Sequence, residues 1–81
     1  MPMEQGVDNE LLSEQVQIER TLFSFDLREN PRGRFLKITE DVGGRRDTVI
    51  IPATGLDKVR DVVERAIQAN RAAGPDAGIA G

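Results

Sequence analysis

Apolar and polar residues alternate along two segments in the first third of the chain, and this period of two constrains the fold more than any other feature of the sequence. The alternation is clear from Gln15 to Glu19 and again from Phe23 to Arg28, which is the pattern of strands with one apolar face. The two segments are out of phase, so the chain must turn or bulge near Arg20 and Thr21 to return its apolar side chains to one face. They are therefore two strands or one long bent strand.

Two turn motifs divide the strands that follow. Asn30-Pro31-Arg32-Gly33 fits a type I turn, since Asn suits the first position, Pro presets φ at the second and Gly is favoured at the fourth. The next strand, Arg34 to Glu40, pairs back until Asp41-Val42-Gly43-Gly44 makes another turn. Arg46 to Pro52 then forms a further strand of Thr, Val and Ile. The pattern predicts a β-meander.

After the last strand the period changes to that of a helix. Thr54 has the spacing of an N-cap, and Asp57 places a carboxylate in the positive first turn. The helix is predicted to end near Arg71, before Gly74-Pro75. We expect it to cover one face of the sheet with a single apolar stripe. The stripe consists of Leu56, Val59, Val63, Ala66 and Ile67.

The chain has room for one domain, which we place at residues 11–71. Residues 1–10 are predicted to be a disordered acidic lead and residues 72–81 a flexible tail of Ala, Gly and Pro. A folded part of about 60 residues buries only about 60% of the surface that its unfolded chain exposes. Because there is no cysteine to form a disulfide or a thiolate metal site, we expect the chain to be stabilised as a homodimer.

The first ten residues contain acidic groups and no apolar stretch, which predicts neither a signal peptide nor a membrane anchor. Together with the absence of cysteine, this favours an intracellular, cytoplasmic protein, and association with the nucleoid fits that location.

The sequence offers no catalytic constellation. It contains no His, Cys or Tyr, which removes the usual general base, the thiolate nucleophile and most transition-metal ligands. The carboxylates of Asp26, Glu29, Glu40 and Asp41 are better explained as a salt-bridged surface than as a tuned acid–base pair. Gly43-Gly44 is a turn, because neither a Walker lysine nor a helix follows it. We therefore expect a protein that is not an enzyme and uses no cofactor or metal.

The formal net charge of −3 hides a basic segment. Residues 28–37 carry four cations and only Glu29 as an anion, a net charge of +3. Within this segment Phe35 and Lys37 point away from the apolar face that Leu36 and Ile38 define. An aromatic ring on a sheet can stack on a base, with about 1 to 3 kcal/mol per base, while neighbouring cations contact phosphates. Alternatively, a partner subunit covers this second face and Phe35 belongs to the dimer core.

These features predict binding of single-stranded DNA or RNA. The alternative is a protein-interaction or structural dimerisation module whose basic hairpin only keeps it soluble. The candidate nucleic-acid-binding residues are Arg28, Asn30, Arg32, Arg34, Phe35, Lys37, Arg20, Gln17, Arg45 and Arg46.

Three segments, in this order and spacing, resemble the PUR repeat of the purine-rich element binding (Pur-alpha-like) proteins. They are Val16-Gln17-Ile18, Phe25-Asp26-Leu27-Arg28-Glu29-Asn30 and Gly33-Arg34-Phe35-Leu36-Lys37-Ile38, within a similarity that covers about residues 10–70. The resemblance implies an α+β fold in which a four-stranded antiparallel sheet is followed by one C-terminal helix, a Whirly-like unit in which two repeats intertwine. It also implies binding of single-stranded nucleic acid, with a preference for purine-rich sequence. A single repeat implies a homodimer, as in the bacterial members of the family.

Overall fold

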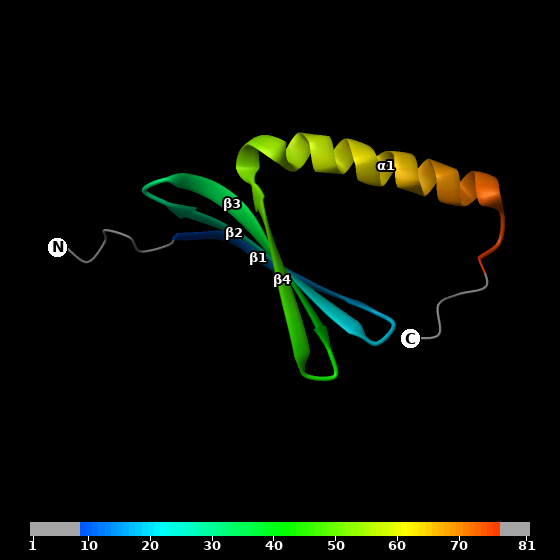
Figure 1. The fold of residues 1–81 in the computed structure, drawn as a ribbon, viewed down its shortest axis with the longest axis horizontal. Helices are drawn as coiled ribbons and strands as arrows, with labels where there is room; N and C mark the ends of the chain where they lie inside the picture. The colour runs from blue at the N-terminus through cyan, green and yellow to red at the C-terminus, as the bar shows by residue number, and fades with distance from the viewer. Residues whose placement is uncertain (1–8, 77–81) are drawn as a thin grey trace.

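The computed structural model describes residues 9–76, which form four antiparallel strands followed by one helix (Figure 1). The strands lie in the sheet in chain order, β1-β2-β3-β4, so the predicted meander and the α+β class are confirmed. The elements are β1 (Asn9–Ile18), β2 (Thr21–Asn30), β3 (Gly33–Val42), β4 (Arg45–Pro52), the 3₁₀ turn η2 (Ala53–Gly55) and α1 (Leu56–Ala73). Most of the predicted acidic lead and flexible tail, residues 1–8 and 77–81, lies outside the described residues.

Strand β1 begins earlier than the alternation predicted. Asn9 and Glu10, which the sequence assigned to the acidic lead, pair with β2. The doublet Leu11-Leu12 breaks the period of two, which concealed this part of the strand from a pattern search. The structure accommodates the doublet by a register shift between Glu10 and Leu12, the effect of one extra residue in a β-bulge.

The β2–β3 turn has the span that the sequence predicted, with Asn30 paired to Gly33, whereas the β3–β4 turn is tighter than predicted. Ile18 pairs with Thr21, so the out-of-phase segments are two strands joined by a two-residue turn. At the β2–β3 turn the Asn30 Oδ1 atom accepts a hydrogen bond of 2.9 Å from the backbone N–H of Arg32. The β3–β4 turn consists of Gly43 and Gly44 with φ values of 60° and 92°, and the strands therefore extend to its two sides. A two-residue hairpin turn with both φ values positive favours glycine at these positions.

The predicted cap at Thr54 is wrong. Residues 53–55 form a 3₁₀ turn, the N-cap of α1 is Gly55, and no side chain caps either helical segment. Asp57 does lie in the first turn, as expected. The helix extends to Ala73, two residues beyond the predicted end, and the N–H of Gly74 donates a 3.2 Å hydrogen bond to the carbonyl of Arg71.

Within this chain, α1 does not cover the sheet. The helix leaves the end of β4 and projects away from the strands, and its main contact is with the 3₁₀ turn that precedes it (Figure 1). None of the described residues is fully buried, and the radius of gyration is 16.1 Å. A compact chain of this length would have a radius of gyration of about 12 Å. A single chain therefore leaves its apolar surfaces uncovered.

The register of the strands separates the sheet into two faces, because directly opposed residues of neighbouring strands share a face. We call the face that carries Phe23, Phe25 and Leu27 of β2 the apolar face, and the face that carries Ser24, Asp26 and Arg28 the polar face. On the apolar face the rings of Phe23 and Phe25 are 6.5 Å apart between centroids. Further exposed members of this face are Leu12, Val16, Ile18, Val42 and Val49.

Candidate nucleic-acid interface

Phe35 lies in the polar face near one end of the sheet. The register aligns it with Arg28 of β2 on one side and Pro52 of β4 on the other. Lys37 follows two residues later on the same face, opposite Asp26 and Ile50. Phe35 and Lys37 are both half-buried. The arrangement places an aromatic residue next to an arginine of the neighbouring strand and a lysine of its own strand, on a partly exposed sheet surface.

Several of the predicted cations are paired with carboxylates of neighbouring strands or turns. Arg28 Nη1 lies 3.5 Å from a carboxylate oxygen of Glu10, and Arg34 Nε lies 3.1 Å from one of Glu29. A third such pair, at 3.1 Å, joins Arg46 Nε to Asp41, at the opposite end of the sheet from the first two. The four cations of residues 28–37 are thus more neutralised than their spacing in the sequence indicates. Among the residues that the structure describes, Arg32 and Lys37 form no ion pair.

Beside Phe35 and Lys37, the polar face carries a hydrogen-bonded row that the sequence analysis did not single out. Ser13 Oγ donates to Asp26 Oδ1 at 2.7 Å, and Gln15 Nε2 donates to Ser24 Oγ at 3.3 Å. Gln15, Ser24 and Asp26 line a hollow of about 260 Å³, which Thr39 and Arg46 also line. Amides, hydroxyls and carboxylates of this kind can bond to the edges of unstacked bases. The polar half of the strand alternation was the signal that could have identified these residues.

Residues 2–76 match the protein family described as PurA ssDNA and RNA-binding protein. The chain belongs to this family. The resemblance to the PUR repeat is therefore confirmed. Among curated proteins, the chain is similar to "Transcription factor Pur-alpha 1" of Arabidopsis thaliana, with 49% identity over 55 residues. That alignment covers 68% of this chain and 19% of the plant protein, so this PurA-family chain spans only a fraction of its relative's length.

The predicted site residues of this PurA-family chain do not form one cluster. Arg20 lies in the β1–β2 turn, and Arg45 and Arg46 follow the β3–β4 turn at the same end of the sheet. Gln17 also lies near this end, where its Nε2 donates a 2.9 Å hydrogen bond to the carbonyl of Glu19. These cations and the Gln17 amide therefore share one end of the sheet but belong to two different hairpins.

The other predicted residues gather at the opposite end, about 30 Å away for strands of ten residues at about 3.3 Å per residue. Asn30 and Arg32 form the β2–β3 turn there. Arg34 lies opposite Glu29 on the other side of the sheet from Phe35, because neighbouring residues of a strand point to opposite faces. Of the candidate residues, Arg28, Phe35 and Lys37 are the ones that share one patch of the polar face.

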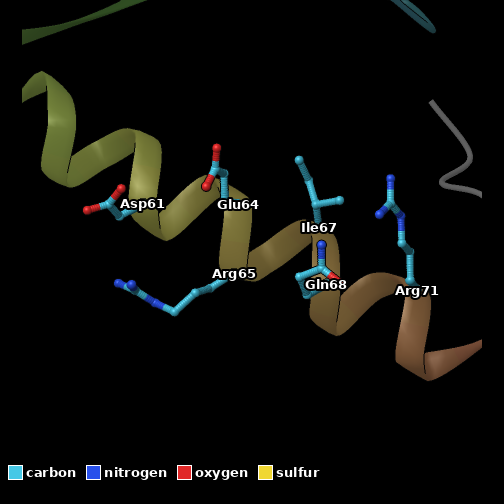
Figure 2. A pocket seen from close by; sticks show the side chains of 6 residues that line it. All are labelled: Asp61, Glu64, Arg65, Ile67, Gln68 and Arg71. Carbon is cyan, nitrogen blue, oxygen red and sulfur yellow. The ribbon is translucent and has the colours of Figure 1, made fainter.

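The helix of the PurA-family chain carries a different kind of surface. Asp61, Glu64, Arg65, Ile67, Gln68 and Arg71 line a hollow of about 590 Å³ along α1 (Figure 2). Glu64, Ile67 and Arg71 point to the same side of the helix in Figure 2, so charged groups border the apolar stripe. Ile67 is 43% exposed. This hollow is the uncovered flank of a helix and not an enclosed site.

Residues 9–76 contain no group of three or more His, Cys, Asp or Glu side chains suited to hold a metal ion. In the same part of the chain, no helix is both long enough and apolar enough to span a membrane.

Proposed function

We propose that this chain binds single-stranded DNA or RNA across the polar face of its sheet. The observation that carries the proposal is the position of Phe35 next to both Arg28 and Lys37 on that face, in a chain of the PurA single-stranded DNA- and RNA-binding family. The ring offers a stacking surface to any base, and the two neighbouring cations can contact phosphates. Stacking tolerates all bases, so selection among bases would fall to the hydrogen-bonding row of Gln15, Ser24 and Asp26.

We infer that the binding form is a homodimer in which two chains exchange their helices. The apolar face and the apolar stripe of α1 are both exposed in one chain, with Val49 at 52% and Val63 at 50% exposure. Because α1 projects away from its own sheet, its stripe is available to the sheet of a second copy. An 18-residue helix is about 27 Å long, which is close to the length of the strands that it would cover. Mutual exchange gives a closed, self-complementary two-fold interface.

This arrangement bears on the two interpretations of Phe35. The surface that the exchanged helix would cover is the apolar face, whereas Phe35 belongs to the polar face. The proposed interface between the apolar face and the exchanged helix therefore does not need to bury Phe35. Its position favours stacking on a base over packing in the dimer core.

A fluorescence-anisotropy titration tests the binding. We expect single-stranded DNA and RNA oligomers to bind more tightly than a duplex of the same sequence, and purine-rich oligomers more tightly than pyrimidine-rich ones. The logarithm of the affinity should fall with the logarithm of the salt concentration, with a slope of about −0.7 for each phosphate contact. Weak, salt-insensitive association would instead favour a protein-interaction module.

Sedimentation equilibrium tests the homodimer. At tens of micromolar we expect twice the chain mass of 8.9 kDa. A single species at the chain mass would contradict the exchange of helices.

A further inference from the structure

A hollow of about 510 Å³ lies where the β2–β3 turn meets the 3₁₀ turn η2. We call it the corner hollow. Its lining includes Glu29, Arg32, Gly33, Arg34 and Thr54. A Cβ built on Gly33 would meet no atom within 4 Å, so the space beside the turn is open. Pro52, which also lines the corner hollow, lies opposite Phe35 on the polar face.

Both arginines of the corner hollow have N–H donors that form no hydrogen bond within the described residues. Arg34 donates through Nε to Glu29 at 3.1 Å, and its terminal nitrogens form no hydrogen bond within residues 9–76. A guanidinium has five N–H donors in a planar fork, so this ion pair orients Arg34 without using all of them. The Arg32 side chain has no ion pair among the described residues, while its backbone N–H is fixed by Asn30. Two guanidiniums against one carboxylate leave the corner hollow with one net positive charge.

Thr54 adds a neutral donor. Its spacing from the helix resembles a cap, yet its hydroxyl caps neither η2 nor α1 and has no hydrogen-bond partner within the described part of the chain. The Thr54 residue is exposed and lines the same hollow as Arg32 and Arg34. A hydroxyl beside two guanidiniums is a donor set that suits the oxygens of a phosphate group.

We propose that the corner hollow binds a phosphate of the single strand, with Arg32, Arg34 and Thr54 as its donors. This inference rests on the proposed nucleic-acid binding and extends it around the end of the sheet. Phe35 and Arg34 are neighbours on opposite faces, so a strand that stacks on Phe35 reaches the corner hollow by passing the β2–β3 turn. The phosphate has two chemical sources, an internal phosphodiester or a terminal phosphate, and both present the same oxygens.

Paired variants test the site in the full-length chain. Thr54→Val keeps the shape of the side chain and removes the hydroxyl, so we expect it to weaken single-strand binding roughly 2- to 10-fold with an unchanged salt slope. Arg34→Gln should reduce the magnitude of the slope by about 0.7, the value of one phosphate contact. Matched controls are Thr21→Val, in the β1–β2 end of the sheet, and Arg65→Gln, on the helix, and neither should change affinity or slope. Circular dichroism and sedimentation should show the same fold and mass for all four variants.

Oligomers with a 5′-hydroxyl, a 5′-phosphate or a 3′-phosphate identify the source. Equal affinities for the three indicate an internal phosphodiester. Tighter binding of a phosphorylated end, lost in Thr54→Val, indicates a terminal phosphate.

A second measurement is independent of nucleic acid. In an NMR titration with inorganic phosphate at constant ionic strength, we expect saturable shifts of the Gly33 and Thr54 amides that are absent in Arg34→Gln. One outcome refutes the site and leaves the proposed function standing. In that outcome the parent binds single strands, Thr54→Val and Arg34→Gln bind them with the parent's affinity and salt slope, and phosphate shifts neither the Gly33 nor the Thr54 amide. If the parent binds no single strand, the proposed function fails, and the phosphate titration alone decides the site.

Discussion

Replacement of Phe35 by alanine separates the contribution of stacking from that of charge. The ring lies half-buried on the polar face, aligned with Arg28 and Pro52, so its removal takes away a stacking surface and no charge. Loss of one base–aromatic stack costs about 1 to 3 kcal/mol, which is roughly a 5- to 150-fold rise in Kd. Because stacking depends little on ionic strength, we expect the same factor at each salt concentration. Two rings of a dimer on one strand would double the free-energy cost.

The assay measures affinity and stability on the same protein. Anisotropy titrations at two salt concentrations give Kd and the salt slope, and thermal melting with sedimentation reports on fold and mass. The matched control is Phe25→Ala, the same substitution on the apolar face, where the ring lies 6.5 Å from that of Phe23. If a second copy covers this face, the control should lose about 3 to 5 kcal/mol of stability and weaken the dimer.

Two results would refute the assignment of Phe35. One is a folded, dimeric Phe35→Ala protein that binds single strands as tightly as the parent. The other is a Phe35→Ala protein that dissociates into monomers and melts at a much lower temperature, which would place the ring in the dimer core.

Three further predictions follow from the register, the helix and the turns. Lys37→Gln should flatten the salt slope in anisotropy titrations by about 0.7 per phosphate contact, because Lys37 has no ion pair within the described residues and is available to a phosphate; an unchanged slope would remove it from the site. Val63→Asp, in the exposed stripe of α1, should shift sedimentation from the dimer toward the 8.9 kDa chain, since the exchange would bury an unpaired carboxylate. Gly43→Val should lower the free energy of unfolding by about 1 to 2 kcal/mol in urea titrations, because φ is 60° at this position, and should leave nucleic-acid affinity unchanged.

The period of two, with the turn motifs, predicted most of the sheet, but it did not decide between two strands and one long bent strand for the first two apolar segments. Alternation in β2 and β3 placed Phe35 and Lys37 on the face opposite Leu36, and the register agrees. It failed at Leu11-Leu12, where two adjacent apolar residues mimic the end of a strand. A bulge depends on pairing with another strand, so local pattern alone does not reveal it. The prediction of an N-cap at Thr54 was also wrong, because residues 53–55 form a 3₁₀ turn and α1 begins only after it.

The candidate site was harder to predict than the fold. Charge counted along residues 28–37 indicated a basic patch, but the ion pair of Arg28 with Glu10 links β2 to β1 and depends on strand register. The split of the cations between two ends of the sheet follows from the meander, since successive turns of antiparallel strands alternate between the ends. Composition and spacing therefore do not reveal which carboxylate pairs with each cation, or at which end of the sheet the cation lies. Both depend on how the strands pair.

Methyl NMR of the parent protein tests the central claim most directly, because neighbouring residues of β4 lie on opposite faces. Ile50 belongs to the polar face with Lys37, whereas Val49 lies opposite Ile38 on the apolar face. On addition of a single-stranded oligomer, we predict saturable shifts of the methyl groups of Ile50 and of Leu22, which is also on the polar face. The methyl groups of Val49 and Ile38 should stay in place. Shifts confined to Val49 and Ile38, or no shifts at a saturating concentration of oligomer, would contradict binding across the polar face.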